Sequence, residues 1–281
     1  MRNRTGFVVL LLSGLLDTSE AQTSPRIVSL DGTVSEIIYE LGLESRLVGV
    51  DVTSTYPASL QKLPQVGHNR SIGAEGVLAQ RPTLVLTTDK AVVKASVLDQ
   101  LRQAGVEVRI FKQEFSAAGA RHLIREVASS CQVPAKGEVL IKRMDADLAK
   151  VKKTSGQPKV LFIYARGAGT MFVAGAGTPV ETMIELAGGK NAAQGFADFK
   201  PLTAEALVVA NPDVILLFDS GLESLRGPGG LLGVPGIAQT QAGKNKRFIT
   251  MDGHLLTGFT PRLGKALAEL ARKIESKESS F

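Results

Sequence analysis

The sequence predicts an α/β protein with two Rossmann-like lobes on parallel sheets, joined by one long α-helix. Short apolar strands alternate with helical runs, which is typical of parallel sheets covered by helices. Residues 74–86 (AEGVLAQRPTLVL) and 204–216 (AEALVVANPDVIL) also repeat one pattern, in which a Glu opens a helix, a Pro ends it and an apolar strand follows. Between the two copies, apolar residues recur at helical spacing over residues 117–153.

The first lobe is expected over residues 22–133. Strands are predicted at residues 26–30, 47–50, 84–86 and 106–111, and helices at residues 33–42, 92–105 and 117–130, besides the helix of the repeat. Thr33 and Glu36 have the spacing of a capping box, which predicts that Thr33 caps the first helix. A loop is expected over residues 51–70.

A connecting helix is expected over residues 134–154, because Pro134 suits a first turn and the segment 154–158 (TSGQP) stops a helix. Such a stiff connector predicts small motions of one lobe relative to the other. The second lobe is expected over residues 155–281. Its strands are predicted at residues 159–164, 214–217 and 247–251, and its helices at 178–187, 263–276 and the second copy of the repeat.

The first 21 residues have the features of an export signal. Two arginines precede an apolar stretch over residues 6–16, too short to span a bilayer, and Ser19–Ala21 fits a cleavage site. A membrane anchor or a wrongly assigned start is the alternative reading. The only cysteine is Cys131, so no cysteine follows the stretch to carry a lipid. We expect a periplasmic protein cleaved near Ala21, without stable membrane insertion, and a Cys131 that packs within a helix.

Composition and motifs exclude several classes of function. The formal net charge is +6, but the basic residues are dispersed and aromatic residues are scarce, so no nucleic-acid partner is expected. The chain contains no G-x-S-x-G, H-E-x-x-H, phosphate-loop or Cys-cluster motif. We therefore expect a protein without catalytic activity. A monomer is also expected. An exported α/β enzyme with a His–Arg site is the alternative from another class.

Two lobes predict a ligand site between them, since small-molecule sites favour domain interfaces. His68 is the leading metal-ligand candidate, because it lies in a loop near the expected crevice and a neutral imidazole binds metals. Arg70 is placed to pair with a carboxylate. His254 follows a predicted strand and is a second histidine within reach of the crevice. For each histidine, a loop position without a ligand is the simpler alternative.

A second candidate cluster follows the first strand of the second lobe. It reads Tyr164-Ala-Arg166-Gly-Ala-Gly-Thr-Met171. Its glycines would let the backbone approach a flat ligand closely. Arg166 would face carboxylates, Met171 would supply polarisable packing, and Tyr164 is a possible phenolate ligand. A Gly-rich turn without a ligand is the alternative.

Five stretches resemble the haem-binding substrate-binding proteins of bacterial ABC haem importers. They are SLDGTVSEIIYELG, TYPASLQKLPQVGHNRSIGAEGVLAQRPTLVL, ARGAGTMFVAG, ETMIELAGGKN and DGHLLTGFTPR. The resemblance covers almost all of the chain after the signal. It implies two lobes joined by one helix, haem as the transported ligand and an ABC permease dimer as the partner. The wider class also carries siderophores and cobalamin, so a ferric siderophore or a corrinoid is the alternative ligand.

The same resemblance assigns roles to residues. It places haem iron on His68, where family members usually have a tyrosinate ligand. Arg70 matches an Arg that supports the ligand or a propionate, and Arg166 stands where some members have a His. In the wider class a Glu on each lobe pairs with an Arg of the permease, which implies that Glu75 and Glu205 dock. Placement of a carboxylate at a helix N-terminus is the alternative reading of both.

Overall fold

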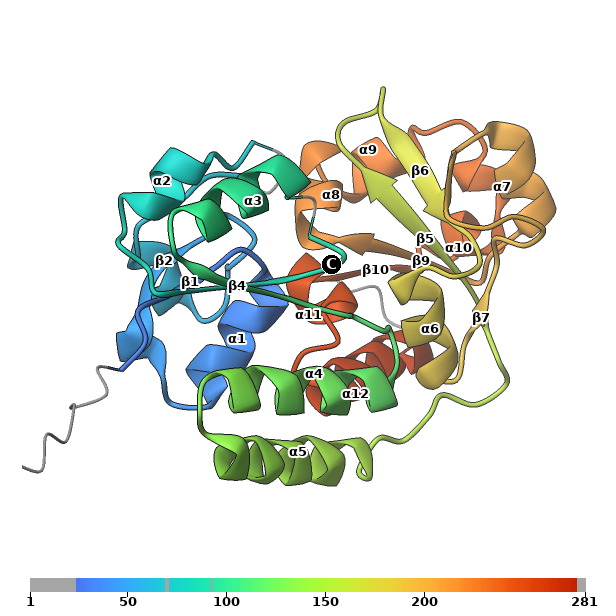
Figure 1. Cartoon of the computed structure of the whole chain (residues 1–281). Coiled ribbons are helices and arrows are strands. Elements are labelled where there is room, and N and C mark those ends of the chain that lie inside the picture. The colour runs from blue at the N-terminus through green and yellow to red at the C-terminus, as the bar shows by residue number, and fades with distance from the viewer. Residues whose placement is uncertain (1–23, 69–70, 92, 277–281) are drawn as a thin grey trace, which may run out of the picture.

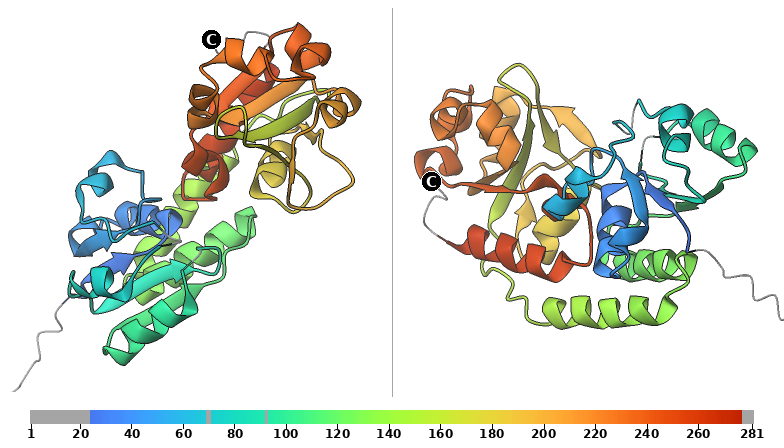
Figure 2. Two further views of the ribbon diagram at one scale, coloured as in Figure 1. Left: turned by 90° about the horizontal axis from the view of Figure 1, so that it is seen from above. Right: turned by 90° about the vertical axis from the view of Figure 1, so that its left-hand side faces the viewer.

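Two lobes stand side by side over a shared layer of helices (Figures 1 and 2). The computed structural model describes residues 24–68, 71–91 and 93–276. The export signal expected over residues 1–21 and the candidate Arg70 lie outside these ranges. Within them, none of the helices is both long enough and apolar enough to cross a membrane.

The N-terminal lobe contains a parallel four-stranded sheet, as predicted. Its strands lie in the order β2-β1-β3-β4 and are β1 (Ile27–Ser29), β2 (Leu47–Val50), β3 (Leu84–Thr88) and β4 (Glu107–Phe111). One face is covered by α2 (Ala74–Leu78) and α3 (Ala95–Gln103). The other is covered by α1 (Gly32–Glu40) and α4 (Ala117–Ser130). Short 3₁₀ turns lie at Glu44–Arg46 and Ala58–Lys62. Because side chains alternate along each strand, the two faces have separate apolar clusters.

The sheet of the C-terminal lobe is mixed, which corrects the prediction of a purely parallel one. Its main path runs β10-β9-β5-β6-β8, with β7 also beside β5. The strands are β5 (Lys159–Ala165), β6 (Met171–Ala174), β7 (Lys190–Asn191), β8 (Phe199–Pro201), β9 (Val214–Phe218) and β10 (Phe248–Met251). The β5–β6 and β6–β8 pairs are antiparallel. The chain reverses after β5 through Gly167, whose φ of +75° favours glycine.

Helices surround this second sheet. They are α6 (Pro179–Leu186), α7 (Ala204–Ala210), α8 (Asp219–Ser224), α9 (Pro228–Leu232), α10 (Gln241–Lys244), α11 (Gly253–Thr257) and α12 (Leu263–Glu275), with a 3₁₀ turn at Ile237–Gln239. The closing helix was predicted within one residue of its observed end. The short helices α8 to α11 were not predicted, since each is too short to show a helical period.

The sequence repeat is confirmed as a structural repeat. Each copy forms a short helix followed by a strand inside a sheet, α2 with β3 and α7 with β9. The turns between helix and strand also match, because Arg81 and Asn211 both have left-handed backbone, with φ of 50° and 39°. Pro82 and Pro212 follow these residues and end the helices.

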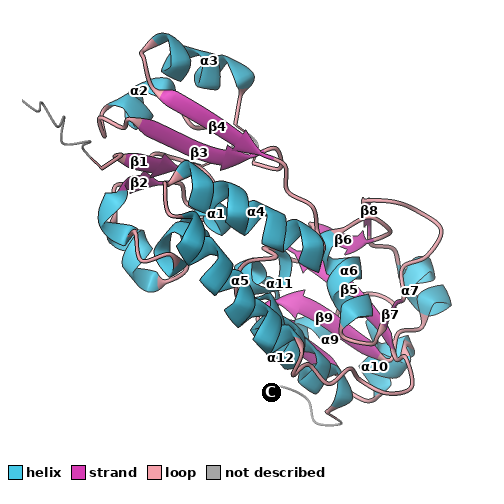
Figure 3. Ribbon diagram, turned by 60° about the horizontal axis from the view of Figure 1, so that its bottom comes forward, coloured by secondary structure: helices cyan, strands magenta, loops and turns pink. Residues whose placement is uncertain are grey.

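The helical layer under the lobes is built around α5 (Pro134–Leu148), which crosses from one lobe to the other beside α4 and α12 (Figure 3). This helix ends sooner than the predicted segment 134–154. Glycines bring its neighbours close: a Cβ on Gly137 would lie 2.6 Å from the Cβ of Ala128, and one on Gly264 would lie 2.6 Å from the backbone of Asp147. A single apolar cluster includes residues of both sheets and of this layer. The lobes therefore share a core along their base.

Candidate functional site

A pocket of about 210 Å³ lies between the two lobes. The N-terminal lobe supplies residues that follow β1, β3 and β4, and the C-terminal lobe supplies residues from α6 and α11. Its polar lining includes Asp31, Lys90, Gln113 and His254. The carboxyl ends of parallel strands are where α/β sheets bind ligands. Since pockets for small molecules measure about 300–1,000 Å³, this pocket is large enough for only part of a haem-sized ligand.

His68 lies on a segment that is pinned to the end of β2. The amide of Val66 donates to Val50 O (2.9 Å), and the amide of Val52 donates to Gly67 O (3.3 Å). On the other side, the amide of Ser71 donates to His68 O (2.7 Å). The His68 side chain is exposed. This backbone anchoring fixes the direction in which the segment leaves the sheet, and the imidazole lies at the surface, where a ligand can reach it.

Tyr164, Arg166 and Met171 lie together on the β5–β6 hairpin, which rises at the top of the C-terminal lobe (Figure 1). The Arg166 guanidinium lies 5.6 Å from the centre of the Tyr164 ring, and Arg166 is exposed. The Tyr164 ring also meets the Phe218 ring edge-on at 6.1 Å. Met171 is half-buried at the start of β6. The hairpin therefore presents a cation and an aromatic ring together. Met171 pairs with Ala165 and packs on the other face of the sheet from Tyr164.

His254 lies in the pocket wall, and its ring is engaged by the opposite lobe. Its Nε2 lies 3.1 Å from Oε2 of Glu36, which is fully buried on α1. An ionised carboxylate only accepts hydrogen bonds, so Nε2 carries the proton. In this arrangement Nε2 cannot bind iron. Of the predicted site residues that the structure describes, His254 is the one that lines the interlobe pocket.

Glu36 has a different role from the one predicted. The N-cap of α1 is Asp31, whose carboxylate accepts from the amides of Thr33 and Val34. Glu36 instead accepts from Nε (2.9 Å) and a terminal nitrogen (2.7 Å) of Arg262, which directly precedes α12. The sequence pattern of a capping box was misleading here, because Asp31 competes for the cap and Glu36 points inward. We call Glu36, His254 and Arg262 the interlobe cluster.

Burial and pairing act in opposite directions on the charges of this cluster. Burial favours the neutral form of Glu36, but hydrogen bonds from His254 and Arg262 outweigh it and lower the pKa of the carboxyl. Burial also opposes the charge of Arg262, yet its hydrogen bonds to Glu36 raise the pKa of the guanidinium. The cluster is therefore a charged pair with a histidine donor, held across the two lobes.

Glu75 and Glu205 occupy equivalent places. Each is exposed in the first turn of its helix, α2 and α7. The two helices lie at the upper, outer parts of the two lobes, on the side that carries the β5–β6 hairpin (Figure 1). Both carboxylates are thus accessible to a partner that spans the lobes.

A third histidine and the cysteine occupy surface and structural positions. His122 is exposed on α4 beside Glu126, and Cys131 is buried in the shared core. In the described part of the chain, no three His, Cys, Asp or Glu side chains gather as a metal cage. A haem iron needs only one or two axial ligands from the protein, and a histidine is a common one.

Residues 27–255 match the family model described as periplasmic binding protein. The solved apo structure of the periplasmic haem-binding protein RhuT from Roseiflexus sp. RS-1 is similar, with 40% sequence identity and a TM-score of 0.85, covering 90% of this chain and 99% of that one. The periplasmic haem-binding protein BhuT, solved with two haems, has 36% identity and a TM-score of 0.84, covering 90% and 98%.

Two curated relatives are more distant. An uncharacterized ABC transporter substrate-binding lipoprotein, YvrC of Bacillus subtilis (strain 168), is 28% identical over 264 residues, covering 92% of this chain and 82% of the relative. The vitamin B12-binding protein of Yersinia pseudotuberculosis serotype O:1b (strain IP 31758) is 28% identical over 223 residues, covering 77% and 76%. The likeness therefore extends over proteins that differ in the molecule they bind.

Proposed function

We propose that this chain, which belongs to the periplasmic binding protein family, binds haem between its lobes and delivers it to an ABC permease. The observation that carries the proposal is the likeness to a periplasmic haem-binding protein at 40% identity over 99% of that chain. The pocket between the lobes adds support, because it lies where α/β sheets hold ligands. Haem is the cargo, and the chain performs no catalysis.

His68 is the proposed axial ligand of the iron. Its exposed imidazole and its anchored backbone suit a ligand that must be reached from the space between the lobes. Arg70 is proposed to support this ligand or a propionate. Arg166 on the hairpin is the proposed propionate partner in the second lobe, and Tyr164 beside it would pack on the porphyrin. Met171, on the same hairpin, is a further proposed haem contact. His254 contributes to the pocket wall.

The remaining parts of the proposal concern where the protein works and how it is divided. A signal peptide over residues 1–21 would export the chain to the periplasm, where it acts as a monomer. The lobes would extend over residues 22–133 and 155–281, with residues 134–154 between them. Glu75 and Glu205 are proposed to meet one Arg on each permease subunit. Their exposure at equivalent helix starts supports this pairing.

A haemin titration of the purified chain tests the proposal. A saturable Soret band is the expected result, with a changed band in His68→Ala. A titration without a saturable absorbance change would remove haem as the cargo. The vitamin B12-binding relative favours a corrinoid as the second candidate, so cobalamin is titrated in parallel by calorimetry. Tight cobalamin binding without haem binding would assign the chain to that ligand.

A further inference from the structure

The interlobe cluster joins elements that are far apart in the chain. Glu36 belongs to α1 in the N-terminal lobe. His254 lies on α11 and Arg262 directly precedes α12, both in the C-terminal lobe. The Glu36 side chain is 0% exposed, and those of His254 and Arg262 are 12% and 13% exposed. The Glu36 carboxylate thus contacts His254 and Arg262 across the boundary between the lobes, in a largely buried place.

Close backbone packing surrounds these charges. Gly258 O accepts hydrogen bonds from Thr33 Oγ1 and from Gln113 Nε2, each at 3.1 Å. A Cβ on Gly32 would lie 2.4 Å from Thr53 O and 3.1 Å from the His254 ring. The Thr53 contact lies within the N-terminal lobe, whereas the His254 ring and Gly258 O belong to the C-terminal lobe. Two hydrogen bonds and one close approach therefore join the lobes beside the cluster.

Arg262 also contacts the segment that leads to His68. Its guanidinium carbon lies 3.4 Å from the centre of the Tyr56 ring, a cation–π contact. Tyr56 lies in the loop that follows β2. This loop returns to the end of β2 where the amide of Val66 donates to Val50 O. Gly67 and His68 follow immediately. One guanidinium therefore touches both the buried carboxylate of α1 and the loop whose end presents the proposed iron ligand.

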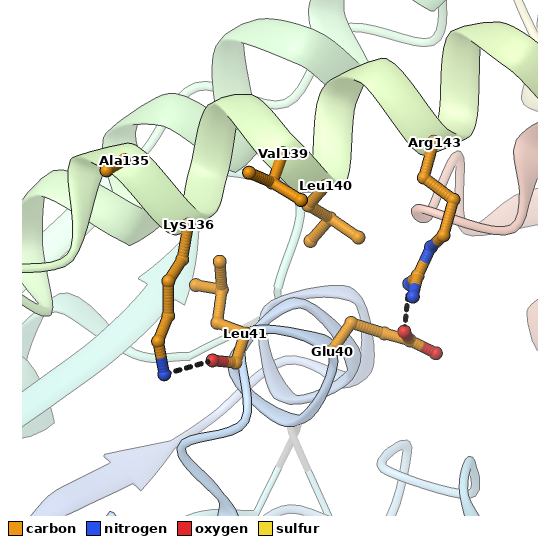
Figure 4. A pocket seen from close by; sticks show the side chains of 7 residues that line it. All are labelled: Glu40, Leu41, Ala135, Lys136, Val139, Leu140 and Arg143. Carbon is orange, nitrogen blue, oxygen red and sulfur yellow. Dashed lines mark hydrogen bonds and ion pairs between the residues drawn. The ribbon is translucent and has the colours of Figure 1, made fainter.

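Contacts in the helical layer at the base show which lobe α5 is attached to. Lys136 Nζ donates to Leu41 O at 3.0 Å, and Arg143 pairs with Glu40, so two contacts hold α5 to the end of α1 (Figure 4). Between them lies a groove of about 310 Å³ over Val139 and other apolar side chains. These contacts attach α5 to the N-terminal lobe. A change in lobe angle must then alter the α5–α12 packing and the interlobe cluster.

We propose that the interlobe cluster is a positioning device that fixes the angle between the lobes and couples this angle to the His68 segment through Tyr56. Separating the lobes would break the Glu36–Arg262 ion pair and the His254 hydrogen bond together, which disfavours the open form. A permease that separates the lobes would also shift Tyr56 and the loop before His68. Opening and loss of the iron ligand would thus be one event. This inference rests on the proposed function for the ligand, although the lobe angle can be measured without any ligand.

Spin labels on equivalent helix positions report the lobe angle. Ala79→Cys, directly after α2, and Val209→Cys, at the matching position on α7, are both exposed, and native Cys131 is buried, so the labels attach selectively. Pulsed electron paramagnetic resonance on the haem-free protein should give a narrow distance distribution. Glu36→Gln should broaden this distribution and speed haem loss to an acceptor globin at least tenfold. Arg262→Lys keeps the positive charge but loses the paired hydrogen bonds of the guanidinium. Its distance distribution and rate of haem loss should lie between those of the unsubstituted chain and Glu36→Gln.

Glu138→Gln is the matched control, because Glu138 forms an exposed pair with Arg125 within the helical layer. It should leave both the distance distribution and the rate of haem loss unchanged. If Glu36→Gln does not fold, the same measurements on Arg262→Lys and His254→Gln decide the question. An unchanged distance distribution in folded cluster variants overturns the proposal, even where their melting temperature falls. Absence of haem binding in the unsubstituted chain would refute the proposed cargo and leave the distance result standing.

Discussion

The Glu36 carboxylate accepts two hydrogen bonds from the Arg262 guanidinium, although 226 residues separate them in the chain. The pair is buried and joins the first helix of one lobe to the last helix of the other. Removing one partner of a buried ion pair leaves an uncompensated charge. Stability and lobe arrangement therefore depend on the same contact.

Acid should weaken this contact. The pKa of Glu36 is lowered from 4.5 in the folded protein, so its stabilisation is complete above pH 4.5 and is lost as the pH falls through the lower folded value. Arg262→Ala should cost about 3–5 kcal/mol of unfolding free energy at pH 7. Urea unfolding at several pH values measures both effects. As the pH falls below 4.5, Glu36→Gln should lose less stability than the unsubstituted chain, and an equal loss in both would contradict the assignment.

His68→Ala should weaken haem binding at least tenfold and change the visible spectrum, because the iron would lose its proposed protein ligand. Absorbance titration with haemin provides the measurement. His122→Ala is the control, since His122 is exposed on α4 at the base of the molecule. If the two variants bind haem alike, His68 is not the ligand and Tyr164 becomes the next candidate.

Arg166→Ala should weaken haem binding about tenfold or more, because charge-assisted hydrogen bonds contribute roughly 1.5–3 kcal/mol. The Soret spectrum should stay the same, since the iron ligand is not altered. Arg272→Ala, an exposed position on α12, should have no effect on binding. The Arg70→Ala variant is measured in parallel. Unchanged affinity in both Arg70→Ala and Arg166→Ala would exclude a propionate contact by either side chain.

The double variant Glu75→Ala/Glu205→Ala should bind haem normally and fail to support haem uptake. Both carboxylates are exposed, so folding should be unaffected. Stimulation of the permease ATPase by loaded protein is the measurement. The control changes Glu185 and Glu275 to Ala, which are exposed on α6 and α12. Full stimulation by the first double variant would rule out docking through these residues.

Cys131 should resist thiol reagents in the folded protein. Burial raises the pKa of its thiol to about 11, against a smaller opposing effect of Arg46, and only the thiolate reacts. A chromogenic disulfide reagent at pH 8 should therefore label the chain only after denaturant is added. Labelling of the native protein at the rate of a free thiol would show that the shared core opens readily.

Local signals accounted for the parts of the fold that the sequence predicted well. Short apolar runs that alternate with helical segments located the four strands of the first sheet. The repeated Glu–Pro phrase located α2 with β3 and α7 with β9. The hairpin after β5 was expected only as a Gly-rich turn. The β5–β6 pair is local, but β6 also pairs with β8, a distant strand that no local pattern encodes as its partner.

The sequence by itself determined the α/β class, the duplicated helix–strand unit and the placement of Glu75 and Glu205 at matching helix starts. These follow from periodicity, capping and Pro chemistry, which act over a few residues. Only the tertiary structure decided the roles of Glu36 and His254. Both were assigned from neighbours in sequence, whereas their partners lie 226 and 218 residues away. Glu36 was expected to help cap a helix, but it pairs with Arg262 of the other lobe. A buried charge is stable only when it is paired, and the fold brings this partner from the opposite lobe.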